Sequence, residues 1–311
     1  MEEQKIIAVV GATGAQGGGL ARAILSDPAG GFTVRAITRH PDSDHAQALA
    51  GRGADVVTAD LDDPASLRRA FDGAYGAYCV TNFWEHFSAD REIAQAAALA
   101  EAARETGLAH TIWSTFEDTR RWVPLDDDRM PTLQGRFKVP HYDAKGEADA
   151  LFTGPTTWLR TSFYWENFIN LGMHPQPGPD GELRLTLPLD GARLPGIAAE
   201  DIGRCAYGIF QQALVDQVIG VSGGNLTGGE LAAEFTGALG RPVRYQPVSP
   251  DEYRKLGFPG ADDLGNMFQF VRDANEEYCE VRDVTRTRSL NPRLLTFAAW
   301  LDTHLEQLPT G

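Results

Sequence analysis

A glycine-rich turn lies between a strand and a helix at the start of the chain. The apolar run Ile6–Val10 is followed by Gly11-Ala-Thr-Gly-Ala-Gln-Gly17, and apolar residues at helical spacing come next. Gly11 permits a tight turn, Gly14 lets the backbone approach a pyrophosphate, and Gly17 lets the helix lie close to the sheet. The start of the helix offers unpaired N–H groups to an anion. The spacing is GxxGxxG, and its place between strand and helix makes it specific.

Strand-like and helical patterns alternate through the first half of the chain, which is typical of a parallel, doubly wound sheet. The expected strands are Ile6–Val10, Phe32–Thr38, Asp55–Thr58, Tyr75–Val80, Thr111–Ser114 and Thr156–Thr161, and the expected helices between them are Ala46–Ala50, Ala65–Phe71, Ile93–Ala103 and Asp143–Phe152. We therefore predict an α/β fold with a Rossmann-type domain over residues 1–155. The strand at 156–161 is expected to return to its sheet.

Residues 162–311 are expected to form a smaller, mixed α/β C-terminal lobe. Capping boxes at Thr227-Gly-Gly-Glu230 and Ser249-Pro-Asp-Glu252 predict helix starts there. The other expected elements are strands Leu183–Leu187 and Val218–Ser222 and helices Asp201–Leu214, Asp262–Val271 and Leu294–Leu305. Between the two regions, Thr115–Pro140 has no clear periodicity. A loop of this length is either a functional lid over a cleft or a solvated, mobile insertion.

The charge and composition of the chain exclude several classes of protein. The 311 residues carry a formal net charge of −15, which disfavours direct binding to nucleic acid. No apolar run is long enough to cross a bilayer, and we expect no secretion signal at the start. Three scattered cysteines without a CxxC pair indicate reduced thiols and a cytoplasmic protein. Without a HExxH motif or a Cys/His cluster, no metal site is expected.

Arg39 ends the second expected strand, 22 residues after Gly17. Proteins that bind NAD usually carry Asp or Glu at this point, whereas an Arg suits the 2′-phosphate of NADP(H). The sequence therefore favours NADP(H), and the alternative is a surface ion pair of Arg39 with Asp42 or Asp44. Asp60 ends the third strand and is a candidate acceptor for the adenine amino group, or a surface loop residue.

Ser114, Tyr142 and Lys145 are a candidate catalytic set for the reduction of a carbonyl. Short-chain dehydrogenases use Tyr-x-x-x-Lys, which places both side chains on one helix face. Here Tyr142 stands three residues before Lys145, and His141 stands four residues before it. Tyr142 and His141 are therefore both candidate proton donors, with packing as the alternative role of Tyr142. Lys145 is the better candidate for a contact to the ribose or the nicotinamide.

These motifs together resemble the NmrA-like family, atypical members of the short-chain dehydrogenase/reductase superfamily, and in particular its HSCARG-type NADPH-sensor branch. The resemblance covers nearly the whole chain. It is carried by the segments Gly11–Gly17, Thr38-Arg39, Val80–Glu85, His141–Glu147, Tyr164–Asn167, Glu252–Ala261 and Leu264–Phe268.

The resemblance implies a site for a nicotinamide dinucleotide. The turn would hold the pyrophosphate, Arg39 the 2′-phosphate, and Lys145 the nicotinamide ribose, while residues 81–83 would line the adenosine and nicotinamide and residues 164–167 would close over the nicotinamide. The expected cofactor-binding residues are Gly11, Thr13, Gly14, Ala15, Gln16, Gly17, Arg39, Asp60, Thr81, Asn82, Phe83, Lys145, Tyr164, Trp165, Glu166 and Asn167.

Two functions remain open from the sequence, and the first of them is favoured. The resemblance implies a redox-sensing or regulatory protein with little turnover, which binds a partner protein and changes its oligomeric state with the nucleotide. The alternative is an NADPH-dependent reductase of a carbonyl, imine or quinone. That branch of the family usually has Phe where this chain has Tyr142, and Ala94 stands where some relatives have Lys. A small apolar substrate would contact the aromatic residues Phe83, Trp84, Phe163, Tyr164 and Trp165.

Overall fold

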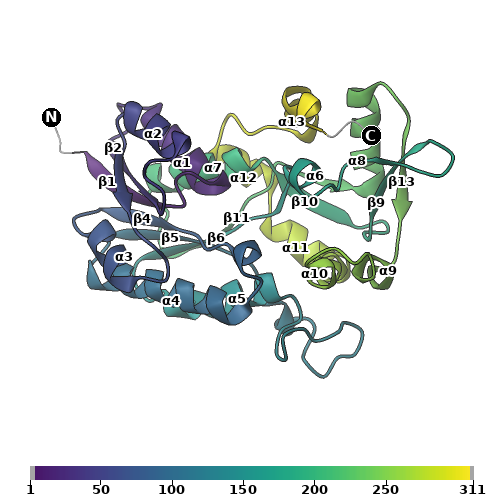
Figure 1. Ribbon diagram of the computed structural model, residues 1–311, viewed down its shortest axis with the longest axis horizontal. Helices are drawn as coiled ribbons and strands as arrows, with labels where there is room; N and C mark the ends of the chain where they lie inside the picture. The colour runs from purple at the N-terminus through teal and green to yellow at the C-terminus, as the bar shows by residue number, and fades with distance from the viewer. Residues whose placement is uncertain (1–3, 309–311) are drawn as a thin grey trace.

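A seven-stranded parallel sheet forms the larger part of the protein (Figure 1). The computed structural model describes residues 4–308, so the first three residues, on which the expectation of no secretion signal partly rests, lie outside it. The strand order is β11-β6-β5-β4-β1-β2-β3. The strands are β1 (Lys5–Val10), β2 (Phe32–Thr38), β3 (Asp55–Thr58), β4 (Gly76–Cys79), β5 (His110–Thr115), β6 (Thr156–Arg160) and β11 (Val218–Gly220). The predicted Rossmann-type fold is confirmed.

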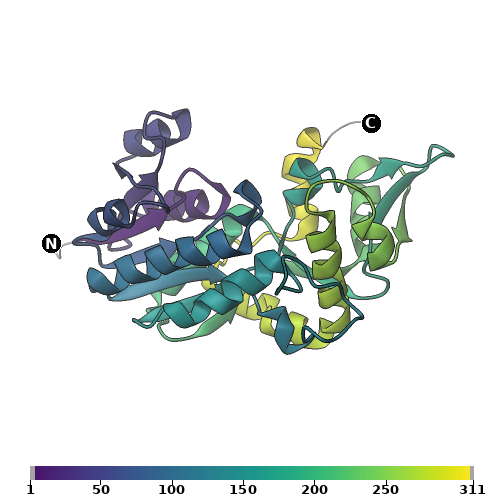
Figure 2. The same ribbon diagram turned by 60° about the horizontal axis from the view of Figure 1, so that its bottom comes forward.

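Helices cover both faces of this sheet (Figures 1 and 2). The alternation of side chains along β1 explains both layers, because Ile7 and Val9 pack on one face while Ala8 and Val10 pack on the other. One layer contains α1 (Ala15–Leu25), α2 (Asp44–Gly51), α7 (Ala199–Gln211) and α12 (Val284–Leu290), and the other contains α3 (Pro64–Phe71), α4 (Ala89–Glu105) and α5 (Pro140–Ala148). Both faces are therefore apolar and buried, as a parallel sheet requires.

The smaller lobe holds two three-stranded sheets with their own apolar core. Its strands are β7 (Phe163–Tyr164), β8 (Gln176–Pro177), β9 (Leu183–Leu187), β10 (Arg193–Ile197), β12 (Gly224–Thr227) and β13 (Val243–Pro247). Its helices are α6 (Asn167–Asn170), α8 (Gly228–Leu239), α9 (Pro250–Arg254), α10 (Ala261–Asp273), α11 (Asn275–Val281) and α13 (Phe297–His304). Both predicted capping boxes are present, at the starts of α8 and α9.

Residues 162–311 do not all belong to the smaller lobe, because some of them pack with the first sheet. Strand β11 pairs with β6 at the edge of the large sheet, and α7 packs closely on α1. A side chain at Gly203 of α7 would lie 2.1 Å from the backbone nitrogen of Leu20 of α1, so this close approach needs glycine. The chain therefore enters the smaller lobe, returns to the first sheet at α7 and β11, enters the lobe again, and returns a second time at α12 before it reaches α13.

Helix α5 begins at Pro140, not at Asp143 as the sequence predicts. Proline suits the first turn of a helix because its missing N–H needs no partner there. The Asp143 carboxylate accepts hydrogen bonds from the backbone N–H groups of Lys138, at 2.7 Å, and Val139, at 3.0 Å. This shift places His141 in the first helical turn.

The segment between β5 and α5 is irregular, as expected, apart from the short turn η2 (Thr119–Arg121), and many of its residues are exposed, but buried contacts anchor it. The buried Lys138 ammonium donates to the carbonyl oxygens of Asp127 and Met130 at 2.8 and 2.7 Å. Asn266 of α10 donates to the carbonyl oxygens of Pro131 and Lys138. The segment is therefore fastened to the smaller lobe along much of its length.

A buried ion pair joins the two lobes. Glu117, which follows β5, accepts two hydrogen bonds from Arg282, which follows α11, at 2.7 and 2.9 Å. Arg282 is fully buried, donates to the carbonyl oxygen of Thr161 at 2.8 Å and stacks on the Tyr278 ring. Burial raises the pKa of Glu117, but the charge and hydrogen bonds of Arg282 outweigh this effect and lower it. The fork geometry satisfies both ions, which a buried pair requires.

We expect Arg282→Met to reduce the free energy of unfolding by about 3–5 kcal/mol, because it leaves the Glu117 carboxylate buried without its main partner. The double variant Glu117→Met/Arg282→Met should recover part of this loss, since no unpaired ion remains. Urea denaturation of the wild type, both single variants and the double variant measures the coupling. If the losses of the single variants simply add, the ion pair does not couple the lobes.

Candidate functional site

The turn after β1 has the geometry of an anion cradle. Gly11 has a φ of +63°, a conformation that favours glycine, and its carbonyl oxygen accepts a hydrogen bond from the Gly14 N–H at 2.8 Å. A side chain at Gly17 would lie 2.5 Å from the carbonyl oxygen of Gly11, so helix α1 packs tightly on the turn. Gly14 and Ala15 are exposed at the helix start. The N–H groups of the first helical turn therefore face an open position, which fits a pyrophosphate.

The Gln16 side chain does not contribute to this cradle. Its carbonyl oxygen accepts hydrogen bonds from the Tyr78 hydroxyl and, at 2.8 Å, from the Ser114 hydroxyl, while its amide donates to the Tyr164 hydroxyl. Burial raises the pKa of Tyr164 to about 12, so this phenol stays protonated at neutral pH. The Gln16 side chain is therefore occupied by Tyr78, Ser114 and Tyr164.

Arg39 lies at the same edge of the sheet and pairs with Glu85, not with Asp42 or Asp44. Its guanidinium donates to both carboxylate oxygens of Glu85, at 2.5 and 3.1 Å. Both side chains are nearly half exposed, so a ligand can reach them. Asp60 is exposed, and its carboxylate accepts from the backbone N–H of Asp62 at 2.9 Å, as in an ordinary surface turn.

Lys145 lies in a buried polar group below the ends of β4 and β5. Its ammonium donates to the Thr81 hydroxyl at 2.6 Å and to the Thr81 carbonyl at 3.2 Å, and it lies 2.8 Å from a carboxylate oxygen of Glu92. Burial raises the pKa of Glu92, but the charge of Lys145, the nearby His86 ring and the hydrogen bond from the Thr81 hydroxyl outweigh this effect and lower the pKa to about 2. Lys145 is therefore held beside Thr81 as one half of an ion pair.

His141 shares the Lys145 face of α5, one helical turn earlier, and forms a pair with Asp263. Its Nδ1 and its backbone N–H both contact the Asp263 carboxylate, which lies in the first turn of α10. Phe83 and Trp84 pack against the imidazole, with ring centroids at 5.9 and 4.9 Å, and Phe116 lies at 6.2 Å. Among residues 4–308, nothing hydrogen-bonds to Nε2. This oriented ring with a free nitrogen is the main chemical group of the site.

Tyr142 and Ser114 do not join His141 and Lys145. The Tyr142 hydroxyl is buried and lies 2.8 Å from the Tyr278 hydroxyl, its ring stacks on Phe116, and burial raises its pKa well above the usual range. Ser114 donates to Gln16 on the α1 face of the sheet, whereas the Lys145 ammonium lies 5.0 Å from the Trp113 ring on the opposite face. The expected Ser–Tyr–Lys set is therefore not assembled, and the structure does not support Tyr142 as a proton donor.

Within the segment Tyr164–Asn167, Tyr164 reaches Gln16 at this edge, and Asn167 is half-buried at the start of α6. Trp165 is buried against Phe297 and Trp300 in the smaller lobe. The Glu166 carboxylate accepts hydrogen bonds from the backbone N–H of Ala199 and from the Trp300 indole N–H. Of the other expected residues, Thr81 and Phe83 are buried next to Lys145 and His141, Thr13 is half-buried in the turn, and Asn82 is exposed.

Three acidic residues of this site were not among the candidates from the sequence: Glu85, Glu92 and Asp263. Their partners are distant in the chain, since Glu85 pairs with Arg39 across 46 positions and Asp263 with His141 across 122. No local motif marks such a pair. The signal that was available for Glu92 is its place on the Ala-rich, buried face of α4, where an acidic residue needs a buried partner.

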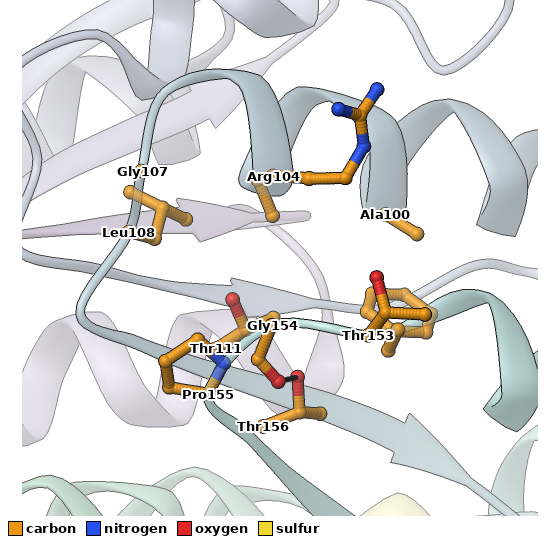
Figure 3. Close-up of a pocket in the computed structure, with 11 residues that line it drawn as sticks. Ala100, Arg104, Gly107, Leu108, Thr111, Thr153, Gly154, Pro155 and Thr156 are labelled. Atoms are coloured by element: carbon orange, nitrogen blue, oxygen red, sulfur yellow. Dashed lines mark hydrogen bonds between the residues drawn. The ribbon is translucent and has the colours of Figure 1, made fainter.

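Between residues 4 and 308, no group of three or more His, Cys, Asp or Glu side chains is arranged to hold a metal ion. A pocket of about 100 Å³ lies near the starts of β5 and β6, lined among others by Thr111, Gly154 and Pro155 (Figure 3). This pocket is at the sheet edge opposite the glycine turn and is too small for a dinucleotide.

The match to known sequences identifies the family. The model of the NmrA-like family matches residues 3–301. The chain belongs to the NmrA-like family. An NmrA-like family domain-containing oxidoreductase from Cladobotryum sp, FrzB, is 33% identical over 299 residues, which cover 88% of this chain and 85% of that protein.

Solved structures share this fold at lower identity. NmrA, a negative transcriptional regulator solved in complex with NADP, is 23% identical with a TM-score of 0.77 and covers 97% of this chain and 95% of its own. The triphenylmethane reductase of Citrobacter sp., solved with NADP(H), is 19% identical with a TM-score of 0.72 and covers 98% of this chain and all of its own. Across residues 4–308 of this NmrA-like protein, no helix is long and apolar enough to span a membrane.

We expect Glu92→Gln to destabilise the protein at neutral pH, because Lys145 loses its carboxylate partner. The pKa of Glu92 falls from an ordinary 4.5 to about 2, so its contribution is fully present above pH 4.5 and is lost as the pH falls toward about 2. A shift of this size corresponds to about 3 kcal/mol.

Urea denaturation over a pH series tests this expectation. The gap in unfolding free energy between wild type and Glu92→Gln should be constant above pH 4.5 and narrow below it. Glu101→Gln, on the exposed side of the same helix, is the matched control and should show no such gap. A gap that is independent of pH would contradict the ion pair.

Proposed function

We propose that this NmrA-like protein is an NADP(H)-dependent oxidoreductase that reduces a carbonyl, imine or quinone, with His141 as the proton donor. The observation that carries the proposal is the His141–Asp263 pair beside Lys145. His141 occupies the position four residues before the Lys, where short-chain dehydrogenases carry their Tyr. The pair lies at the carboxyl edge of the sheet, where ligands of open α/β folds bind.

The described residues fit a nicotinamide dinucleotide. The N–H groups at the start of α1 would hold the pyrophosphate, Arg39 the 2′-phosphate, and Lys145 with Thr81 the nicotinamide ribose. When bound, the dinucleotide supplies the hydride. NmrA has been solved with NAD as well as with NADP, so the preference of this chain for NADP(H) rests on Arg39.

The role of the His141 ring follows from its contacts. The Asp263 carboxylate accepts at Nδ1, which fixes the orientation of the ring and leaves Nε2 as the nitrogen available to a substrate. A proton held at Nε2 can pass to the oxygen or nitrogen of a substrate as its carbon is reduced. Phe83 and Trp84 exclude water from one side of the ring and favour an apolar, flat substrate. FrzB, whose name calls it an oxidoreductase, supports this class of reaction.

A redox-sensing function is the second candidate, and the state of Tyr142 and Lys145 favours it. The Tyr142 hydroxyl is bonded to Tyr278, and Lys145 is paired with Glu92, so the usual Tyr–Lys pair of a short-chain dehydrogenase is missing. A protein of this kind would bind NADP(H) without consuming it and signal through a partner or a second copy of the chain. The regulator NmrA supports this reading by its fold alone. The cysteines Cys79, Cys205 and Cys279, all unpaired, support a reducing, cytoplasmic location.

The absorbance of NADPH over a panel of aldehydes, ketones, imines and quinones separates the two functions. We expect consumption of NADPH with one compound class. His141→Asn should lower turnover by about 10²–10⁴-fold, the usual contribution of a general acid, while NADPH still binds. Asp263→Asn should lower it less, because the ring loses its orientation but keeps its nitrogen.

Tyr142→Phe is the control for this experiment, since its buried hydroxyl is bonded to that of Tyr278. This variant should keep the wild-type rate. Loss of activity in Tyr142→Phe together with full activity in His141→Asn would show that His141 is not the proton donor. A flat trace with every compound, in a sample shown by titration to bind NADPH, would favour the redox sensor.

A further inference from the structure

We propose that Glu85 determines dinucleotide specificity by occupying the guanidinium that a 2′-phosphate would need. The carboxylate belongs to the chain itself and competes with the 2′-phosphate of NADP(H), but not with the 2′-hydroxyl of NAD(H). This inference rests on the proposed dinucleotide site, in which Arg39 holds the 2′-phosphate. It assigns to Glu85 a role against that ligand, which Arg39 alone does not imply.

The Arg39–Glu85 pair has the geometry that a contact between Arg39 and a 2′-phosphate would have. Two guanidinium nitrogens of Arg39 each donate to one carboxylate oxygen of Glu85, at 2.5 and 3.1 Å. This two-pronged arrangement is the one by which Arg recognises both carboxylates and phosphates. A 2′-phosphate that approaches the same nitrogens must therefore displace the Glu85 carboxylate.

Charge makes the competition selective. The pKa of Arg39 is raised by the hydrogen bond from its guanidinium to Glu85 and by the negative charge of Glu85. The charges of Asp60 and Asp62 raise it further. Asp62 is in turn paired with Arg91 at 2.6 Å, so Glu85 is the carboxylate that directly covers Arg39. A phosphate with nearly two negative charges meets repulsion from Glu85, whereas a neutral hydroxyl does not.

The pair is weak enough to exchange. Arg39 and Glu85 are 47% and 44% exposed, and surface ion pairs of this kind contribute little to stability. Glu85 ends the short turn η1 (Phe83–Glu85), whose other two residues, Phe83 and Trp84, pack against His141. A 2′-phosphate that displaces Glu85 would therefore bind next to Trp84, which packs against the His141 imidazole.

The test compares probes with and without a 2′-phosphate. Calorimetric titration with adenosine 2′,5′-bisphosphate and with adenosine 5′-monophosphate measures the effect on binding, independently of turnover. Glu85→Gln should bind the bisphosphate about fivefold more tightly, which corresponds to about 1 kcal/mol, the upper range for an exposed ion pair. Its affinity for the monophosphate should not change. NADPH and NADH should show the same contrast.

Three further variants separate an effect of Glu85 from a general effect of charge and from failure of the 2′-phosphate site. Glu182→Gln removes a comparably exposed carboxylate that pairs with Arg244 at 3.0 Å in the other lobe, and it should change neither affinity. Glu85→Ala should repeat the result of Glu85→Gln if the charge alone matters. No change, an equal change for both probes, or weaker binding of the bisphosphate by Glu85→Gln would overturn the role of Glu85. If Arg39→Met binds the bisphosphate as tightly as the wild type, the proposed 2′-phosphate site itself is wrong.

Discussion

The close packing of α1 on the turn after β1 is the constraint on which the rest of the site depends. A side chain at Gly17 would overlap the carbonyl oxygens of Val10 and Gly11, so only glycine allows the helix to start so close to the strand. The amide groups of the first turn consequently point past the carboxyl edge of the sheet. Every other group of the proposed site lies along that edge, because parallel strands bring their carboxyl ends together.

Buried contacts between acidic side chains and Lys, His or Arg then position the groups along this edge. Lys145 is held by Glu92 within the first lobe, whereas His141 is oriented by Asp263 from the second. A third pair, Glu117 with Arg282, fixes the lobes relative to each other at the same interface. The consequence is that the proposed proton donor, His141, is oriented only when the smaller lobe is in place. In the proposed reaction this lobe therefore contributes to the chemistry of the site.

Local patterns in the sequence predict most of the large sheet, and long-range pairing explains what they leave out. The bounds of Phe32–Thr38, Asp55–Thr58 and Leu183–Leu187 are reproduced, because turn residues delimit each run. Two-residue strands such as β7 and β8 have no period to detect, and β11 joins the first sheet through pairing that no local signal encodes. Likewise, the sequence shows the four-residue spacing of His141 and Lys145. It does not show that Asp263 and Glu92 are their partners, because only the fold brings these residues together.

The structure of this protein crystallised with NADP⁺ is the most direct test of the central claim, that a dinucleotide lies along this edge with its reactive ring beside His141. The account predicts the pyrophosphate on the amides of Ala15, Gln16 and Gly17 and the nicotinamide next to the free Nε2 of His141. A dinucleotide bound at another edge of the sheet would contradict the account. So would a nicotinamide ring separated from His141 by the Phe83 and Trp84 side chains.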